Sequence, residues 1–157
     1  MTALPAVPYS PDATLLLILA CSGRKTATRA RAIDLYHGVM YSTLRAHRKA
    51  EAMPAIVILS AEHGFISPEQ MLDPYDRRMT PQRADEMLAG LAGFAAPGIW
   101  PDSIGSAFFA GGHEYRRVMR AILALLCPEA AAMARETFGA IGQQRAQLGA
   151  YLRGLGN

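Results

Sequence analysis

The chain has 157 residues, of which 51% are hydrophobic and 18% are charged. This length and composition fit one compact domain with a substantial core, and they exclude a largely disordered chain. The formal net charge of +3 permits a nucleic-acid partner without requiring one, because an ordinary basic surface gives the same value.

The first residues and the cysteines favour a cytoplasmic protein. Residues 1–12 contain three prolines and no basic residue, which indicates an extended arm rather than a signal peptide, ahead of one domain over residues 13–157. The apolar run at 15–20 is too short to span a membrane. Cys21 and Cys127 are far apart and no Cys-x-x-Cys pair occurs, so neither a disulfide framework nor a structural zinc site is expected.

Three apolar runs alternate with amphipathic segments along the chain. Residues 14–20, 55–59 and 104–112 have the character of strands buried on both faces. Helices are expected over about 30–50, 81–95 and 113–126, and residues 129–157 are helical in character. Gly38 is expected to break the first of these helices. This alternation predicts an α/β domain with a mostly parallel open sheet and helices on both of its faces.

Each expected strand runs directly into polar residues. In a parallel sheet these loops share one edge, where ligands bind. The longest loop, over residues 60–80, is stiffened by Pro68 and Pro74. Side chains predicted to converge there are those of Cys21, Ser22, Arg24, Lys25, Ser60, Glu62, His63, Tyr75, Asp76, His113 and Tyr115, with Gly64 in the same loop and Gln143 directed towards the site from the C-terminal segment.

These residue types suit acid–base chemistry on a base or a sugar. Glu62, His63, Asp76 and His113 are the candidate catalytic groups: a carboxylate stabilises a cationic sugar, and a histidine moves a proton. Tyr75, Tyr36 or Tyr41 can stack on a base, and Arg24 and Lys25 can hold a phosphate. Several alternatives remain open. Cys21 is either a nucleophile or a small residue in a turn, and Tyr36 either stacks on a base or belongs to the core. Cys21, His63 and His113 either bind zinc together or have separate roles. The basic helix face around Arg45, His47, Arg48 and Lys49 is either an ordinary solvated surface or a surface that contacts the phosphates of a nucleic acid.

Two segments resemble known families. "LYHGVMYSTLRA" and "ILSAEHGFISPEQMLDPYDRRMT" are similar to motifs of the YaaA-type peroxide-stress family, as is the Glu114-Tyr115 pair. A closer likeness is to short bacterial and phage domains with a cysteine-serine-x-x-lysine loop, here Cys21 to Lys25, and an isoleucine-glycine-glutamine-glutamine motif, here residues 141–144. A further likeness is to the core domain of archaeosine synthase, which modifies a deazaguanine base in tRNA.

The resemblance implies a YaaA-like α/β fold and a function on nucleic acid or its bases. The main hypothesis is an enzyme that cleaves an N-glycosidic bond or modifies a base, with a nucleotide, nucleobase or nucleic acid as partner, DNA before RNA, and no cofactor or metal. The alternative is a non-catalytic DNA-binding protein of the oxidative stress response. The chain is shorter than YaaA-type proteins, and it has Asp76 where that family has arginine.

Overall fold

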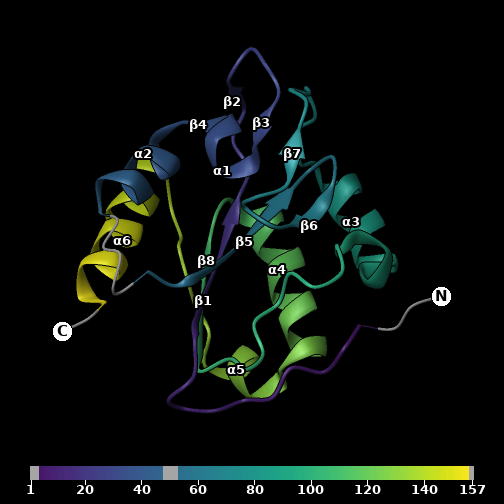
Figure 1. The fold of residues 1–157 in the computed structure, drawn as a ribbon, viewed down its shortest axis with the longest axis vertical. Coiled ribbons are helices and arrows are strands. Elements are labelled where there is room, and N and C mark those ends of the chain that lie inside the picture. The colour runs from purple at the N-terminus through teal and green to yellow at the C-terminus, as the bar shows by residue number, and fades with distance from the viewer. Residues whose placement is uncertain (1–3, 48–52, 156–157) are drawn as a thin grey trace.

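A five-stranded sheet forms the centre of the computed structural model, which describes residues 4–47 and 53–155 (Figure 1). Its strands are β1 (Leu15–Ala20), β5 (Ala55–Ser60), β6 (Gly64–Ile66), β8 (Ser106–Ala110) and β9 (Arg135–Glu136), in the spatial order β6-β5-β1-β8-β9. Only β6 runs antiparallel to its neighbour within this sheet. The predicted fold class, α/β with a mostly parallel sheet, is confirmed.

The middle strand, β1, is paired along both edges. Leu17 lies opposite Ile56 of β5 and Phe108 of β8. Two small antiparallel pairs lie beyond the carboxyl ends of the large strands: β2 (Arg24–Lys25) with β4 (Tyr36–His37), and β3 (Ala30–Arg31) with β7 (Met71–Leu72). These pairs form the upper part of the molecule in Figure 1.

Helices cover both faces of the sheet. They are α1 (Ala32–Leu35), α2 (Val39–Ala46), α3 (Pro81–Ala89), the short 3-10 helix η1 (Leu91–Phe94), α4 (His113–Leu126), α5 (Pro128–Met133) and α6 (Ile141–Gly154). Alternate residues of β1 enter two separate cores, with Leu16 and Ile18 facing α3, α4 and α5, and Leu17 and Leu19 facing α1, α2 and α6. The period of two along a strand accounts for this division.

The three predicted strands are confirmed, whereas two segments predicted to be helical contain short strands: residues 129–157 include β9, and residues 30–50 begin with β3. The segment expected to be helical over residues 30–50 contains α1, the short strand β4 and then α2. Gly38 separates them with a φ of 125°, which a side chain disfavours, so the break expected at this glycine is confirmed. Residues 48–50, with Arg48 and Lys49, lie outside the described residues.

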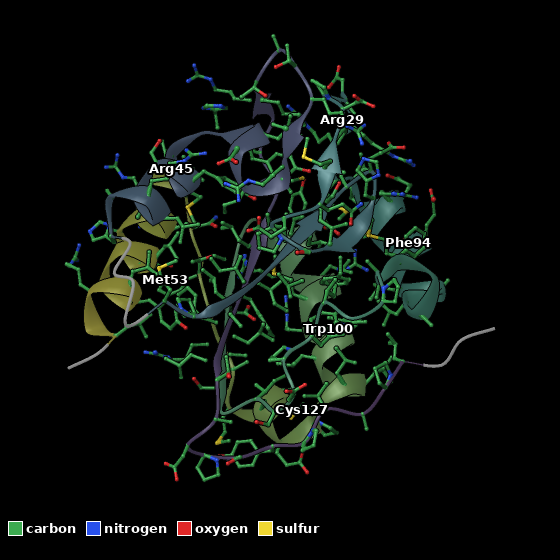
Figure 2. All side chains as sticks on the ribbon, viewed as in Figure 1. Arg29, Arg45, Met53, Phe94, Trp100 and Cys127 are labelled. Atoms are coloured by element: carbon green, nitrogen blue, oxygen red, sulfur yellow. The ribbon has the colours of Figure 1, made fainter. Side chains whose placement is uncertain are left out.

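The predicted helix starts and stops are better matched. Thr80 caps α3 by accepting a hydrogen bond from the Arg83 N–H, and Pro81 occupies the first turn. The helix after β8 ends at Leu126, directly before Cys127 and Pro128. Cys127 is buried at the end of the molecule away from Arg29 (Figure 2). Within the described residues, no helix has the length and hydropathy needed to cross a bilayer.

The segment that follows β5 forms a tight hairpin rather than one long loop. Ser60 of β5 pairs with Gly64 of β6 across the turn at residues 61–63. Gly64 has a φ of 78° and its α-carbon faces the backbone of Phe94, so an added Cβ would overlap the Phe94 carbonyl oxygen. This position requires glycine for two reasons, the positive φ and the close backbone approach.

We therefore expect Gly64→Ala to lower the free energy of unfolding by about 2–4 kcal/mol, since neither the backbone angle nor the contact can relax cheaply. Gly90→Ala is the matched control, because its φ is −152° and no atom lies within 4 Å of an added Cβ. That control should stay within about 0.5 kcal/mol of wild type in urea unfolding. Equal stability of the two variants would contradict this account of the hairpin.

Candidate functional site

A cavity of about 360 Å³ opens where β1 and β8 end. It lies at the sheet edge where the sequence predicts the site, beside the first residues of α2, α4 and α6. Its wall is formed by Ala20, Cys21, Ser22, Gly23, Arg24, His37, Gly38, Val39, Met40, Tyr41, Ala110, Gly111, Gly112, Tyr115 and Ile141. A volume of this size is ordinary for a small-molecule site.

Cys21 contributes a free thiol to this wall. Its Sγ lies 3.3 Å from the Tyr115 hydroxyl oxygen, and it accepts a hydrogen bond from the Ala61 N–H at 3.5 Å. The Cys21 N–H donates to the Leu59 carbonyl, which extends the β1–β5 pairing by one residue. The sulfur is thus held in place by contacts from two other segments, α4 and the β5–β6 turn.

A second polar cluster lies behind Cys21, at the end of β5. The Ser60 hydroxyl oxygen accepts hydrogen bonds from the N–H groups of Glu62 and His63, at 3.2 and 3.0 Å. It lies 2.7 Å from the Tyr75 hydroxyl, which is 2.6 Å from that of Tyr36. Because two N–H groups occupy both acceptor sites of Ser60, its proton goes to Tyr75, and Tyr75 in turn donates to Tyr36.

Burial keeps these phenols neutral. It raises the pKa of Tyr36 to about 12, and it also raises the pKa values of Tyr75 and Tyr115. Tyr41 is fully buried with its hydroxyl donated to the Ala20 carbonyl at 3.0 Å, and its pKa is raised by the same burial. At neutral pH the tyrosines of the site therefore act as hydrogen-bonding acids rather than as bases.

Positive charge is placed on one side of the site. Arg24 lines the cavity, and the Lys25 ammonium lies 4.4 Å from the centre of the Tyr75 ring. The N-terminal residues of three helices add to it, because Gly38, Gly112 and Ile141 all line the cavity. The unpaired N–H groups and the dipole at a helix start favour anions. The cavity thus combines a thiol and a phenol with a rim suited to a negatively charged group.

The four predicted catalytic residues do not form part of the cavity wall. Among the described residues that form the wall, Glu62, His63, Asp76 and His113 are not found. Glu62 pairs with Arg77 at 3.4 Å, and the exposed His63 ring meets the Tyr75 ring edge-on at 5.2 Å. Asp76 is exposed, and His113 is exposed at the start of α4.

The predicted binding residues divide into two groups. Cys21, Ser22, Arg24, Tyr41 and Tyr115 line the cavity. The others lie outside this wall. Ser60, Tyr36 and Tyr75 form the hydroxyl cluster, and Lys25 lies over the Tyr75 ring. Gly64 lies in the β5–β6 hairpin, and Gln143 accepts a hydrogen bond from the Ala140 N–H at 2.9 Å. Tyr36 is fully buried, which decides for the core alternative.

Several residues of the cavity wall and its surroundings are not among those predicted from the sequence. Val39, Met40 and Gly112 line the cavity, and the glycines at 38 and 112 were the signal that helices begin there. Arg83 gave no signal. It is buried, and its guanidinium donates to the carbonyls of Ala61 and Glu62 at 2.8 and 3.0 Å, holding the turn whose N–H meets Cys21.

A metal site is not supported by the arrangement of side chains. No group of three or more His, Cys, Asp or Glu residues in the described parts of the chain is placed to hold a metal ion. Cys21, His63 and His113, the three residues of the zinc alternative, therefore do not form such a group. Cys21 and Cys127 are both free thiols.

Comparison with known proteins identifies a family but no function. Residues 16–149 match the model of a family of unknown function (DUF6884). No curated protein and no solved structure matches the chain. The match covers the sheet except for Leu15, and it covers every segment of the cavity wall, from Ala20 to Ile141.

The buried phenols give a test of the hydroxyl cluster. Tyr36→Phe should lower the free energy of unfolding by about 1 kcal/mol at pH 7, because it removes the acceptor of the Tyr75 proton. Tyr151→Phe should cost nothing or stabilise, because the buried Tyr151 hydroxyl has no hydrogen-bond partner among the described residues. Equal losses for the two variants in urea unfolding would contradict the cluster.

The same two phenols predict a loss of stability in alkali. Burial raises the pKa of Tyr36 and of Tyr151 to about 12, so the folded protein holds these protons more tightly than the unfolded chain, in which tyrosine has a pKa near 10. The stability that these two protonated phenols contribute is therefore fully present below about pH 10, and it is lost as the pH rises towards 12. Each variant should show a shallower decline in unfolding free energy across that interval than wild type does.

Proposed function

The chain belongs to the DUF6884 family, whose function is unknown, and we propose from its site that it is an enzyme acting on a nucleobase or on the N-glycosidic bond that carries the base. The observation that carries the proposal is the Cys21–Tyr115 pair in the wall of a cavity with cationic groups at its rim. The resemblance to base-modifying and YaaA-type proteins agrees with it. Two free thiols support a reducing, cytoplasmic location.

The shape and lining of the cavity suit a flat, largely apolar group. Ala20, Ala110 and Met40 provide apolar surface, and Tyr41 adds an aromatic ring that is itself fixed by a hydrogen bond. Val39 and Ile141 remain partly exposed at 41% and 57% on the same wall. A nucleobase matches such a site because its faces are apolar and its edge carries polar atoms.

The rim suits the phosphate of a nucleotide. Arg24 contributes a full positive charge, and the helix starts at Gly38 and Gly112 contribute N–H groups. The Ser22 hydroxyl donates to the Arg24 carbonyl at 2.7 Å, which shapes the loop that presents the arginine. A base in the cavity and a phosphate at this rim would orient the molecule for reaction at Cys21.

The neutral phenol and the thiol have complementary roles in this proposal. Tyr115 keeps its proton because burial raises its pKa, so it can donate to a ring nitrogen or oxygen of the base. Cys21 Sγ is placed beside it as the nucleophile. If the reaction instead cleaves the glycosidic bond, the carboxylates of Glu62 and Asp76 stabilise the cationic sugar, as carboxylates do in glycosidases.

The non-catalytic alternative, a DNA-binding stress protein, has less support. Many arginines that could contact phosphates are engaged with carboxylates: Arg29 with Asp73, Arg31 with Asp34 and Glu69, Arg77 with Glu62, Arg83 with Glu86, Arg116 and Arg120 with Glu136, and Arg117 with Asp85 and Glu114. Displacing these pairs would reduce the gain from phosphate contacts.

The first experiment tests for turnover and for the reacting group. Wild type is incubated with nucleotides and with modified and unmodified oligonucleotides, and altered or released bases are detected by mass spectrometry. We expect Cys21→Ser to lower kcat about 100-fold or more, because serine is a far weaker nucleophile at neutral pH. Cys127→Ala controls for loss of a thiol, since Cys127 is buried outside the cavity.

Asp76→Asn in the same assay separates the two chemistries. A loss of turnover with ligand affinity kept within about tenfold indicates glycosidic cleavage, where the charge matters mainly in the transition state. Full turnover indicates chemistry on the base itself. A wild type that alters nothing in the panel but binds DNA with a steep salt dependence would replace the enzyme proposal with the non-catalytic alternative.

The second experiment tests the cavity as the binding site. Gly112 lines it with open space around an added Cβ and a φ of −69°, so Gly112→Leu should fold and fill the cavity. We expect this variant to lose nucleotide binding in calorimetry at least about tenfold. Gly90→Leu is the matched control, because it also meets open space but lies outside the cavity wall. Unchanged binding by the Gly112 variant would place the ligand elsewhere.

A further inference from the structure

The isoleucine-glycine-glutamine-glutamine motif at the start of α6 is not explained by the proposed chemistry. Its glutamines instead fasten the loop at residues 137–140, which joins β9 to α6. Gln143 accepts from the Ala140 N–H at 2.9 Å, and the Gln144 amide bonds the Thr137 hydroxyl at 3.0 Å and the Gly139 carbonyl at 2.9 Å. The loop is therefore rigidly held from the helix side.

A third glutamine fixes the residue at the centre of this loop. The Gln147 side-chain amide accepts from the Phe138 N–H at 2.9 Å and donates to the Phe138 carbonyl at 3.3 Å. Thr137 is fully buried and also bonds the backbone of Gly111. Gly139 has a φ of 82°, which completes the tight turn.

This rigid loop presents an aromatic ring to solvent. The Phe138 side chain is 63% exposed although both of its backbone polar groups are bonded. Exposure of a large apolar side chain to water is unfavourable, and the two hydrogen bonds from Gln147 hold the backbone of Phe138 in the position that exposes it. A preorganised, exposed aromatic ring is a common anchor in binding sites, because little conformational entropy is lost on contact.

The segment from Phe138 to Ile141, called the ridge below, contributes one residue to each of two cavities. Ile141, three residues further on, lines the cavity that contains Cys21. Phe138 itself lines a second, larger cavity of about 740 Å³ between β9 and α6, together with Phe108, Arg135 and Tyr151. A molecule that crossed this ridge would contact Phe138 while a part of it remained in the first cavity.

The second cavity is lined by one cation, Arg135, and by one carboxylate, Glu136. The Arg135 guanidinium lies 5.9 Å from the Phe108 ring and 5.8 Å from the Tyr151 ring, and it has no ion pair within the part of the chain that the structure describes. The neighbouring carboxylate, that of Glu136, is neutralised by Arg116 at 3.1 Å and by Arg120 at 3.4 Å. The surface beyond Phe138 therefore suits a phosphate.

We propose that Phe138 stacks on the base next to the one held in the first cavity, that Arg135 contacts the adjoining phosphate, and that the ligand is consequently a single-stranded nucleic acid rather than a free nucleotide. This inference rests on the proposed function and names its substrate class. An aromatic platform beside a cation is the usual means of binding single strands without regard to sequence. The glutamines of α6 act here as positioning residues for the platform.

The test measures binding of two probes. One is a fluorescein-labelled, mixed-sequence 12-mer, as DNA and as RNA, followed by anisotropy; the other is each nucleoside 5′-monophosphate, followed by calorimetry. Phe138→Ala should weaken binding of the 12-mer about tenfold, within the range of a lost stacking contact, and should leave mononucleotide affinity within about twofold. Phe138→Trp should keep the affinity for the 12-mer.

Two further variants sharpen the result. Leu125→Ala is the control for loss of an exposed apolar side chain, since Leu125 is 60% exposed on α4 and lies outside both cavities, and it should bind the 12-mer as wild type does. Arg135→Gln should weaken binding and should lower the slope of log affinity against log salt by about one.

The outcomes separate the inference from the proposed function. If the Phe138→Ala variant binds the 12-mer as tightly as the Leu125→Ala variant does, the stacking platform is overturned. The proposed function still stands in that case if the Gly112→Leu variant loses mononucleotide binding. Wild type that binds mononucleotides but no 12-mer also overturns the inference. Wild type that binds neither probe overturns both. A preference for DNA or for RNA in the two arms identifies the strand.

Discussion

The fold and the site depend on the burial of β1 on all sides. Its residues Leu16–Leu19 are fully buried between helices on both faces, and parallel strands pair with both of its edges. A strand in this position presents reactive groups only beyond its end, where the sheet opens to solvent. Cys21 is the first residue past that end, so its thiol reaches the cavity wall. The same geometry brings Gly111 and Tyr115 from beyond β8.

Hydroxyl groups at the end of β5 hold this edge together. Ser60 is fully buried, so its hydrogen-bonding capacity has to be satisfied within the protein. It takes two N–H groups of the turn and gives its proton to Tyr75, which ties the loop after β7 to the sheet and, through Tyr36, to the segment before α2. Arg83 fixes the opposite side of the turn. The N–H that meets Cys21 is thus held by two independent sets of contacts.

The proposed site and the proposed stacking platform use residues that are three positions apart, Ile141 and Phe138. Ile141 belongs to the wall around Cys21, and Phe138 faces the groove with Arg135. The glutamines of α6 connect them, because their amides bond the loop instead of remaining available to a ligand. A nucleotide strand over this ridge would place one base near the thiol and its neighbour on the exposed ring. In this proposal, the start of α6 would connect the thiol with the stacking ring.

The sequence by itself determined the three longest strands of the sheet and the edge at which the cavity lies, because buried strands, helix caps and polar strand ends leave local patterns, as at Leu15–Ala20 and at Thr80-Pro81. It did not indicate β6 or β9, because strands of two or three residues are too short to leave such a pattern. It also placed Cys21, Arg24 and Tyr115 at that edge. Only the tertiary structure decided which side chains enter the cavity. Glu62 and Asp76 share a polar loop with Tyr75, yet Tyr75 turns inward to Ser60 while Asp76 is exposed. Arg83 and Phe138 acquire their roles from contacts across the fold, and such distant pairings have no periodicity in the chain.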